Sequence, residues 1–422
     1  MRALRDKRIV LLVIGTYIYA RLAGGRPPFF IFYLSAALWL TCWAWSLYTA
    51  RSLDCLIRLD RTTVRKDEHF TVRVRLDNEA LLSIPWLEVD VQTSPLVRVD
   101  SPAQATSVPP AGSRMLNLQL TARRRGHYTV GPIRVSTGDP FGLYRLAREF
   151  KSNATVTVYP RVWHLTGLPI PLNQPFGPAR IRQLAFEDPS NPAGIRPYVA
   201  GDSPRHIHWR TTARKGDLML KQYELQATTQ LLIAMDLQAV VQRRDEENDT
   251  AETAIDIAAS LANLGLERGF EVAVAGYGAT RHAVALGRGQ RTFQQIMETL
   301  TRVEADGNVA LHKALQWESA YLPPHAGVAV ITPQLDAALA DVLLRLQGSH
   351  AVSLVLLKAE TFGSDGPIPI ASRDALALTL AAHGIGVYAV GAQDDLRRLQ
   401  ELQLARNLVS VRPGPRPQAR RG

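Results

Sequence analysis

The distribution of apolar and polar residues divides the chain into an apolar start, an alternating middle and a mixed second half. Between Pro28 and Ala50 lie about 23 consecutive residues without a formal charge, and roughly 20 suffice to cross the hydrocarbon core of a bilayer as a helix. The shorter apolar run from Ile9 to Ala20 reaches about 17 residues when it is extended through Arg21 to Gly25, if the Arg21 side chain extends its charge to the membrane interface. A glycine- and proline-rich connection favours a turn between the two runs. The sequence therefore predicts a transmembrane helical hairpin in residues 1–51, embedded from Ile9 to Ala50.

Basic residues flank the predicted hairpin at both outer ends, whereas the connection carries only Arg21 and Arg26. Because basic residues accumulate on the cytoplasmic side of membrane helices, both termini are expected in the cytoplasm. The predicted location is the bacterial inner membrane, with two crossings and the bulk of the chain cytoplasmic. An alternative interpretation is a cleaved signal peptide built from the basic start and Ile9–Ala20. The flanking basic residues are Arg2, Arg5, Lys7 and Arg8 before the first run, and Arg51, Arg58, Arg61, Arg65 and Lys66 after the second.

Residues 52–160 alternate between apolar and polar positions, which places the apolar side chains on one face of a strand. The clearest alternation runs over 70–76 and 116–120, and turn residues separate further short runs. About seven short strands predict an immunoglobulin-like β-sandwich. No residue pattern in this stretch indicates catalysis, so a binding or spacer role is expected. The further expected strands are 86–91, 128–135, 144–150 and 155–159.

Residues 230–411 alternate between short apolar strands and amphipathic helices, the pattern of a mostly parallel sheet with helices on both faces. The predicted fold is doubly wound, and ligands in such folds bind beyond the carboxyl ends of the strands. Asp236 and Thr332 each end a predicted strand, so they mark the expected binding edge. The segment 161–229 is predicted to link the two domains, and 412–422 to form a disordered basic tail. Expected strands are 231–235, 270–275, 327–331, 352–357 and 387–390, and expected helices are 250–266, 292–303, 309–321, 335–346 and 373–383.

The net charge of +11, from 49 basic and 38 acidic residues, would suit nucleic acid or anionic lipid as a partner. Much of the excess lies at the chain ends and beside the predicted hairpin, and no nucleic-acid-binding motif accompanies it, so nucleic acid is not an expected partner. The two cysteines, Cys42 and Cys55, cannot by themselves form a disulfide framework or a zinc site. No Walker-type phosphate loop, nucleophile elbow or His-Glu metalloprotease pattern occurs. The sequence therefore predicts no enzymatic activity.

The most distinctive segment of the chain joins the two predicted domains. It reads IRPYVAGDSPRHIHW from Ile195 to Trp209 and is followed by Ala213-Arg214 and by KQYE at 221–224. This segment closely resembles the signature of a bacterial family named domain of unknown function fifty-eight, with the pattern R-x-Y-x-x-G-D-x-x-R-x-I-x-W-x-x-x-A-R. Together with the predicted hairpin, the resemblance covers nearly the whole chain. Further segments that resemble the family's preceding β region are 123–128, 139–143 and 158–161.

The resemblance implies a von Willebrand factor type A-like α/β domain, and a MoxR-type AAA ATPase as a partner in the assembly or remodelling of protein complexes. Such domains often bind magnesium through Asp-x-Ser-x-Ser, a Thr and an Asp from three loops, because hydroxyl and carboxylate oxygens suit that ion. In this chain both serines, the Thr of the second loop and the last Asp are missing. Asp236 and Thr332 would therefore form a degenerate site, and neither magnesium nor another cofactor is expected. The three loops read Asp236-Leu237-Gln238-Ala239-Val240, Gly307-Asn308-Val309 and Thr332-Pro333-Gln334.

The signature segment is the main predicted binding segment. Five Arg or Lys residues and one acid, Asp202, lie between residues 195 and 215, a charge balance that suits a phosphate, a nucleotide or an acidic protein surface. Alternatively the segment is an internal brace, in which Asp202 pairs with an arginine and Trp209 packs under another. His206 and His208 would share one face of a strand and suit a metal, although spacing supplies no third ligand. The predicted binding residues are Arg196, Tyr198, Gly201, Asp202, Arg205, His208, Trp209 and Arg214.

The predicted fold class is thus α/β plus all-β, behind an N-terminal transmembrane hairpin. The leading interpretation is a membrane-anchored, non-enzymatic scaffold or adaptor that binds protein partners on the cytoplasmic side. A metal- or nucleotide-regulated sensor that uses Asp236 and Thr332 is a second interpretation. An envelope-related hydrolase of unrecognised type is a third. The sequence leaves open the partner, the process served, the oligomeric state and the choice between interface and brace.

Overall fold

A computed structural model of the chain forms two compact units, Met1–Arg161 and Val162–Gly422. The residues that it describes are 2–5, 7–100, 105–165, 186–198, 207–226, 230–245, 248–323, 326–363 and 370–404.

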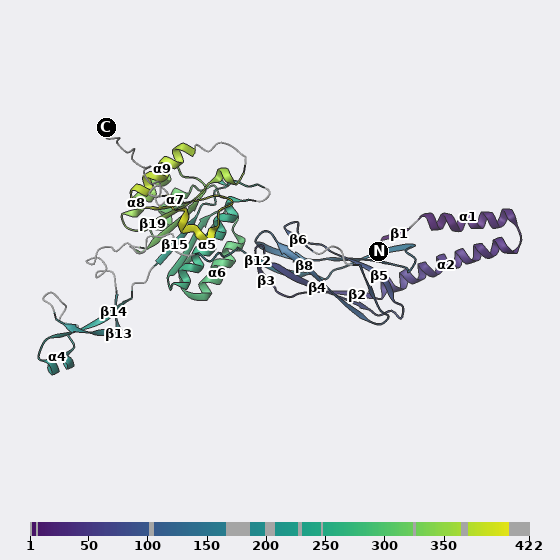
Figure 1. The fold of residues 1–422 in the computed structure, drawn as a ribbon, viewed down its shortest axis with the longest axis horizontal. Coiled ribbons are helices and arrows are strands. Elements are labelled where there is room, and N and C mark those ends of the chain that lie inside the picture. Colours follow the sequence, from purple (N-terminus) through teal and green to yellow (C-terminus); the bar gives the residue numbers. More distant parts are fainter. Residues whose placement is uncertain are drawn as a thin grey trace, which may run out of the picture. The chain divides into compact units, whose positions relative to one another are not determined.

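The first unit begins with two antiparallel helices in contact, α1 (Lys7–Ala23) and α2 (Arg26–Arg51) (Figure 1). Gly24 and Gly25 connect them with φ angles of 65° and 85°, a left-handed region that glycine adopts without steric cost. α2 is long and apolar enough to cross a membrane, and only 11% of its most apolar window is buried. α1 is apolar over the shorter stretch Val10–Ala23. Both predicted helices are therefore present, and one has the length and composition of a membrane span.

Three β-sheets of the first unit surround one buried apolar core. Side chains from Phe70 to Leu76 alternate between buried and more exposed positions along β4 (His69–Asn78), as the period of two in a strand requires. The expected strand 128–135 is instead two strands, because Pro132 has no N–H to donate and interrupts the ladder. The sheet orders are β1-β11-β10-β5-β7, β3-β12-β9 and β2-β4-β8-β6. The other strands are β1 (Arg2–Arg5), β2 (Leu53–Leu59), β3 (Thr63–Arg65), β5 (Ile84–Val91), β6 (Val97–Val99), β7 (Ala105–Val108), β8 (Ser113–Ala122), β9 (Gly126–Val130), β10 (Ile133–Gly138), β11 (Tyr144–Phe150) and β12 (Ala154–Tyr159).

Both outer ends of the helical hairpin attach to this β-sheet unit. Before α1, strand β1 pairs antiparallel with β11, with Arg2 opposite Ala147 and Arg5 opposite Tyr144. After α2, the single residue Ser52 leads directly into β2. The start of α1 and the end of α2 therefore lie at the same end of the hairpin, against the same β-sheet unit.

The described part of the second unit contains a two-stranded antiparallel sheet with part of the signature segment. Its strands are β13 (Phe186–Pro197) and β14 (Met219–Gln226), paired so that Pro197 lies opposite Met219. Between the strands lies the short helix α4 (Trp209–Lys215). Gly201, Asp202, Arg205 and His206 of the signature lie outside the described residues.

The main sheet of the second unit has six strands in the order β17-β16-β15-β18-β19-β20. Every neighbouring pair is parallel except β16 with β17, which is antiparallel. In order of appearance along the chain the strands stand as 3-2-1-4-5-6, the order of a doubly wound sheet. The strands are β15 (Gln230–Met235), β16 (Glu271–Tyr277), β17 (Arg281–Gly287), β18 (Gly327–Thr332), β19 (Ala351–Leu357) and β20 (Gly386–Val390).

Helices cover both faces of this sheet, α5 and α6 on one face and α7, α8 and α9 on the other (Figure 1). α5 is buried along most of its length, and a Cβ atom added at Gly265 would lie 2.9 Å from the Val272 side chain. Glycine therefore allows this helix to lie close to the sheet. The strand and helix series expected from the sequence is confirmed, with β17 in addition. The helices are α5 (Thr250–Glu267), α6 (Gly289–Arg302), α7 (Leu311–Ser319), α8 (Ala337–Gln347) and α9 (Ile370–Ala382), with short 3-10 turns at Ala239–Val241, Ala359–Thr361 and Leu396–Leu402.

Candidate functional site

The carboxyl ends of β15 and β18 lie side by side at the point where the winding of the sheet reverses. Asp236 follows β15 and is 4% exposed, and Thr332 ends β18 and is fully buried. The Thr332 hydroxyl donates to Oδ2 of Asp236 at 2.7 Å, and the Gln238 backbone N–H donates to Oδ1 at 3.2 Å. The structure therefore brings together the two residues predicted at this edge, and each carboxylate oxygen has a donor from the chain.

Burial raises the pKa of the Asp236 carboxyl above its ordinary value of 3.8. The hydrogen bonds from Thr332 and Gln238 oppose this rise, and the nearby Asp336 carboxylate adds to it. Asp336 itself caps α8 by accepting the Leu339 backbone N–H at 2.7 Å. In the folded chain Asp236 therefore keeps its proton to a higher pH than an aspartic acid side chain in water does.

The loop around Gly307 packs directly against the loop that follows Asp236. The Gly307 N–H donates to the Leu237 carbonyl at 2.9 Å, and the Ala239 N–H donates to the Gly307 carbonyl at 2.8 Å. A Cβ atom at position 307 would lie 2.2 Å from the Tyr277 carbonyl oxygen, so only glycine fits. The three loops that the sequence analysis singled out therefore meet at one edge of the sheet.

The donor set at this edge does not fit a magnesium ion, which takes six oxygen ligands in near-octahedral geometry. Both oxygens of Asp236 already accept hydrogen bonds from the chain. The two positions that hold serine in the domains resembled are Gln238 and Val240, and Val240 is 71% exposed. Within the described ranges, no group of three or more His, Cys, Asp or Glu residues could hold a metal ion. The Asp236 carboxylate is thus satisfied by hydrogen bonds within the chain.

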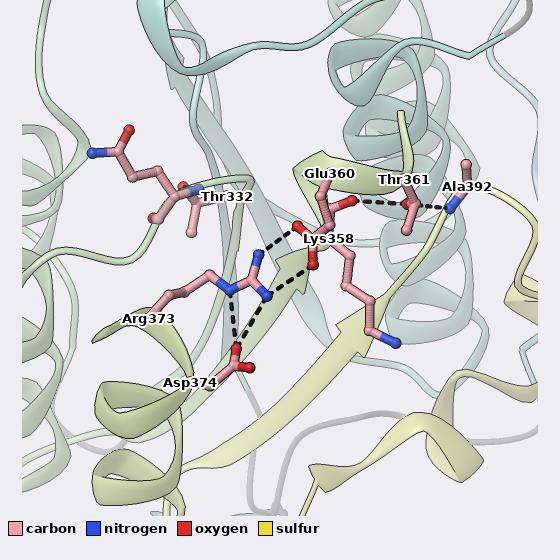
Figure 2. A network of polar contacts seen from close by, with 8 residues as sticks. Thr332, Lys358, Glu360, Thr361, Arg373, Asp374 and Ala392 are labelled. Atoms are coloured by element: carbon pink, nitrogen blue, oxygen red, sulfur yellow. Dashed lines mark hydrogen bonds and ion pairs between the residues drawn. The ribbon is translucent and has the colours of Figure 1, made fainter. Parts of the chain in front are cut away.

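A second polar cluster lies beyond the ends of β19 and β20 and was not predicted from the sequence. Arg373, from α9, is 4% exposed and donates to both carboxylate oxygens of Glu360, at 2.6 and 2.9 Å (Figure 2). It also donates to Asp374 at 3.0 and 3.1 Å. The Arg373 hydrogen bonds hold the pKa of Glu360 below its ordinary value, although burial opposes the shift. Paired charges therefore fix α9 against the turn that follows β19.

A third polar cluster joins β16, β17 and α7. Glu318 accepts from the Tyr277 hydroxyl at 2.8 Å and from Arg281 at 2.8 and 3.0 Å. Burial would raise the pKa of Glu318, but the hydrogen bonds from Arg281 and Tyr277 outweigh it and leave the pKa below its ordinary value. The Trp317 ring, 50% exposed, lies 5.5 Å from the Tyr277 ring. An exposed aromatic side chain is thus held close to the Gly307 loop.

The described part of the signature segment places an aromatic and basic surface on α4. Trp209 is 68% exposed, and Arg210, Arg214 and Lys215 are exposed as well. The chain around α4 is held by backbone hydrogen bonds of 2.8 Å, from Tyr198 to Leu218 and from His208 to Met219. Trp209 is therefore largely exposed among the described residues, and the choice between interface and brace stays open.

His208 is the N-cap of α4 and does not continue a strand. Its Nδ1 accepts the backbone N–H of Thr211 at 3.1 Å and lies 2.8 Å from the Thr211 hydroxyl. The expected strand with two histidines on one face is therefore wrong for His208, because the chain turns into a helix there. Of the other predicted binding residues, Arg196 lies in β13 and Tyr198 just after it.

These features define an α/β protein with a doubly wound sheet, preceded by the signature segment and a β-sheet unit. Residues 194–368 match the family model described as "Protein of unknown function DUF58". The match confirms the family predicted from the signature, over residues 194–368 of the chain. This region includes α4, the Asp236 edge and strands β15 to β19.

One relative and two solved structures show what the chain is similar to. The uncharacterized protein YeaD of Bacillus subtilis (strain 168) is 23% identical over 303 residues, which cover 71% of this chain and 74% of YeaD. A FixG-related protein from Vibrio parahaemolyticus is 14% identical over 25% of this chain and 96% of its own, with a TM-score of 0.19. Native alpha-2-macroglobulin from Escherichia coli is 14% identical over 30% of this chain and 21% of its own, with a TM-score of 0.21. TM-scores this low define neither fold nor function.

Proposed function

We propose that the chain is a non-enzymatic adaptor, anchored in the membrane by α1 and α2, that binds a protein partner through α4 and the signature segment. The observation that carries the proposal is the exposure of Trp209 beside Arg210, Arg214 and Lys215 on one short helix. Trp and Arg are the residues that most often dominate binding energy at protein interfaces. The excess of positive charge on α4 favours an acidic surface on the partner.

The proposed anchoring is supported by the apolar surface of the helical hairpin. Large apolar residues that face outward from both helices would form an unusually large exposed patch in water. The β1–β11 pairing and the direct passage from α2 into β2 favour two crossings, with both outer ends on one side. The basic residues at those ends then favour the cytoplasmic side for the bulk of the chain. The exposed residues include Leu11, Leu12, Tyr19, Leu22, Phe30, Tyr33, Leu34 and Leu40.

The proposed fold assignments follow the family resemblance. A von Willebrand factor type A-like domain is supported in the second unit by the 3-2-1-4-5-6 order and the antiparallel edge strand β17. An immunoglobulin-like sandwich is supported in the first unit by sheets around one core in which every described strand pair but β3–β12 is antiparallel. The family resemblance also suggests the partner: we propose a MoxR-type AAA ATPase, with which the chain would act in the assembly or remodelling of protein complexes.

A ligand-regulated sensor is the second candidate function, favoured by the Thr332–Asp236 hydrogen bond at the reversal point of the sheet. Under that proposal a ligand would compete for the Asp236 carboxylate. Thermal unfolding of the purified full chain with added magnesium, and separately with ATP, tests it. A rise in Tm that Asp236→Asn abolishes would favour the sensor, whereas an unchanged Tm with both additions would reject it.

Affinity capture from native membranes tests the adaptor proposal. The full chain would be compared with a Trp209→Ala, Arg214→Glu double variant and with Arg268→Glu, an exposed arginine beyond the end of α5. We expect wild type and Arg268→Glu to recover the same specific protein, and the double variant to lose it while keeping the wild-type Tm. Equal recovery by all three chains would reject α4 as the binding surface.

A further inference from the structure

α2 is fixed to the β-sheet unit along its last three turns. Cys42, Ser46 and Thr49 are buried and recur at helical spacing on the face that meets β10 and β11. At the end of the helix, Arg148 of β11 donates to the carbonyl groups of Ala50, Arg51 and Leu53, at 3.1, 3.3 and 2.8 Å. Carbonyl groups at a helix C-terminus lack partners within the helix, so this arginine completes the junction. The β-sheet unit therefore keeps a set position along the helix axis.

The loop between β10 and β11 lies beside α2. Asp139 of this loop is fully buried, and its carboxylate accepts the backbone N–H groups of Phe141 and Tyr144 at 2.9 and 2.6 Å. Tyr144 is opposite Arg5, two residues before α1 begins, so the loop lies at the end of the sheet that meets the hairpin. Phe141 is 69% exposed. The loop thus presents an outward apolar ring beside the body of the apolar helix.

Two features of the hairpin place the membrane interface at the same level along α2. Thr16 of α1 faces Ser35 of α2 with their hydroxyl oxygens 3.0 Å apart, so Lys7, nine residues earlier, lies across from residue 44, nine residues later. Basic residues at the start of a membrane helix mark the headgroup region. Aromatic residues gather around the same level of α2, as they do at membrane–water interfaces. They are Trp39, Trp43, Trp45 and Tyr48.

On the basis of the proposed membrane anchoring, we propose that residues 139–143 form a second membrane contact, with Phe141 inserted among the lipid headgroups beside α2. The loop adjoins Tyr144, which pairs with Arg5 just before the start of α1, so it lies at the level that the basic and aromatic residues mark. The loop contacts the bilayer interface and not a protein partner, because α2, which holds the loop, crosses this interface in the proposed anchoring.

Spin-label accessibility in the full chain, reconstituted in vesicles of phosphatidylcholine and phosphatidylglycerol, tests this contact. Single variants would carry the label at Phe141→Cys, at Leu38→Cys in the middle of α2 and at Met115→Cys on β8, which is 57% exposed. The wild-type chain serves as the labelling control, since both cysteines are buried and burial raises the pKa of Cys55 to about 12. The ratio of collisions with oxygen to collisions with a water-soluble nickel complex rises with membrane depth.

We expect the ratio at residue 141 to lie several-fold above that at residue 115 and below that at residue 38. Equal ratios at 141 and 115, with a high ratio at 38, would place the loop in water or under a protein partner and overturn the proposed contact, while the anchoring would stand. A ratio at 38 as low as that at 115 would overturn the anchoring, and the loop contact with it.

Discussion

The two longest helices that the structure describes, α2 and α5, are both rich in apolar residues, yet their surroundings are opposite. In α5, 14 of 18 residues are buried between the sheet and its neighbours. In α2, 4 of 26 residues are buried, all in its second half. Removal of apolar surface from water is stabilising by about 25 cal/mol per Å². Other parts of the chain cover the apolar surface of α5, whereas they leave most of α2 uncovered. The difference agrees with the proposal that a bilayer surrounds the first half of α2.

The two regions also satisfy their polar groups differently. Hydroxyl groups of α2 donate to the backbone of their own helix, as Thr41 does to the Ala37 carbonyl at 2.8 Å and Thr49 to that of Trp45 at 2.9 Å. At the edge of the main sheet, Thr332 donates instead to Asp236, which is 96 residues away in the chain. A helix that lies in lipid must satisfy its backbone and hydroxyl groups by itself, whereas a folded interior can use distant partners.

The largest effect is expected from a charge placed in α5. Leu261→Arg puts a guanidinium group at a fully buried position without a partner, which should cost at least about 4 kcal/mol and unfold the second unit. Leu378→Arg, at a position of α9 that is 42% exposed, is the control and should cost less than about 0.5 kcal/mol. Limited proteolysis and thermal unfolding of the full chain compare the two. If Leu261→Arg kept the wild-type Tm, the packing of α5 given above would be wrong.

The same change in α2 should leave the fold intact and weaken membrane insertion. Leu34 lies about midway between the tip of the hairpin and the level of residue 44 and is 60% exposed, so Leu34→Arg places a charge near the bilayer centre at a cost of about 3 kcal/mol. The expected result is a smaller carbonate-resistant membrane fraction with unchanged proteolysis of the two folded units. An unchanged membrane fraction would mean that this position of α2 does not lie in lipid.

A smaller loss of stability is expected at the reversal point of the sheet. Thr332→Val keeps the shape of the side chain but removes the donor to the buried Asp236 carboxylate, which should cost about 2 kcal/mol. Thr379→Val is the control, because the exposed Thr379 hydroxyl bonds only to the Ala375 carbonyl of its own helix. Equal Tm values for the two variants would contradict the role given to the Thr332 hydroxyl.

The smallest effect is a pH dependence that comes from Asp236. Its pKa is raised in the folded chain, so the folded state binds this proton more tightly than the unfolded state does. Its contribution to stability is therefore largest below the ordinary value of 3.8 and falls as pH rises through the raised pKa. Asp236→Asn lacks the titrating carboxyl, so only the wild type should lose this contribution as pH rises. The Tm of the variant minus the Tm of the wild type should therefore increase from about pH 4 to pH 7. A Tm difference that stays constant over this range would show that Asp236 does not titrate differently on folding.

Hydrophobic periodicity predicted the elements of the α/β unit because each strand and helix buries one continuous set of apolar residues. α5, expected over 250–266, runs from Thr250 to Glu267, after the N-cap Asp249 and before Gly269. The edge strand β17 was missed because most of its residues are only half-buried and glycines flank it, which made the segment resemble a loop. A partly buried antiparallel edge leaves a weaker pattern than a central parallel strand.

The candidate site was predictable only where backbone topology brings residues together. Asp236 and Thr332 could be paired in advance because parallel strands end at one edge of a sheet. The contact between Arg373 and Glu360, and that of Glu318 with Tyr277 and Arg281, depend on helix and turn placements that no local pattern encodes. The exposure of Trp209 was likewise open, because an aromatic residue beside arginines suits both a brace and an interface.

The most direct test of the membrane-anchored account is thiol labelling in intact cells with a membrane-impermeant maleimide. Ala23→Cys places a thiol at the tip of the hairpin, and Met115→Cys places one on the β-sheet unit. The account predicts that residue 23 is labelled in intact cells and residue 115 only after the membrane is permeabilised. Labelling of residue 115 in intact cells, or protection of residue 23 until permeabilisation, would contradict it.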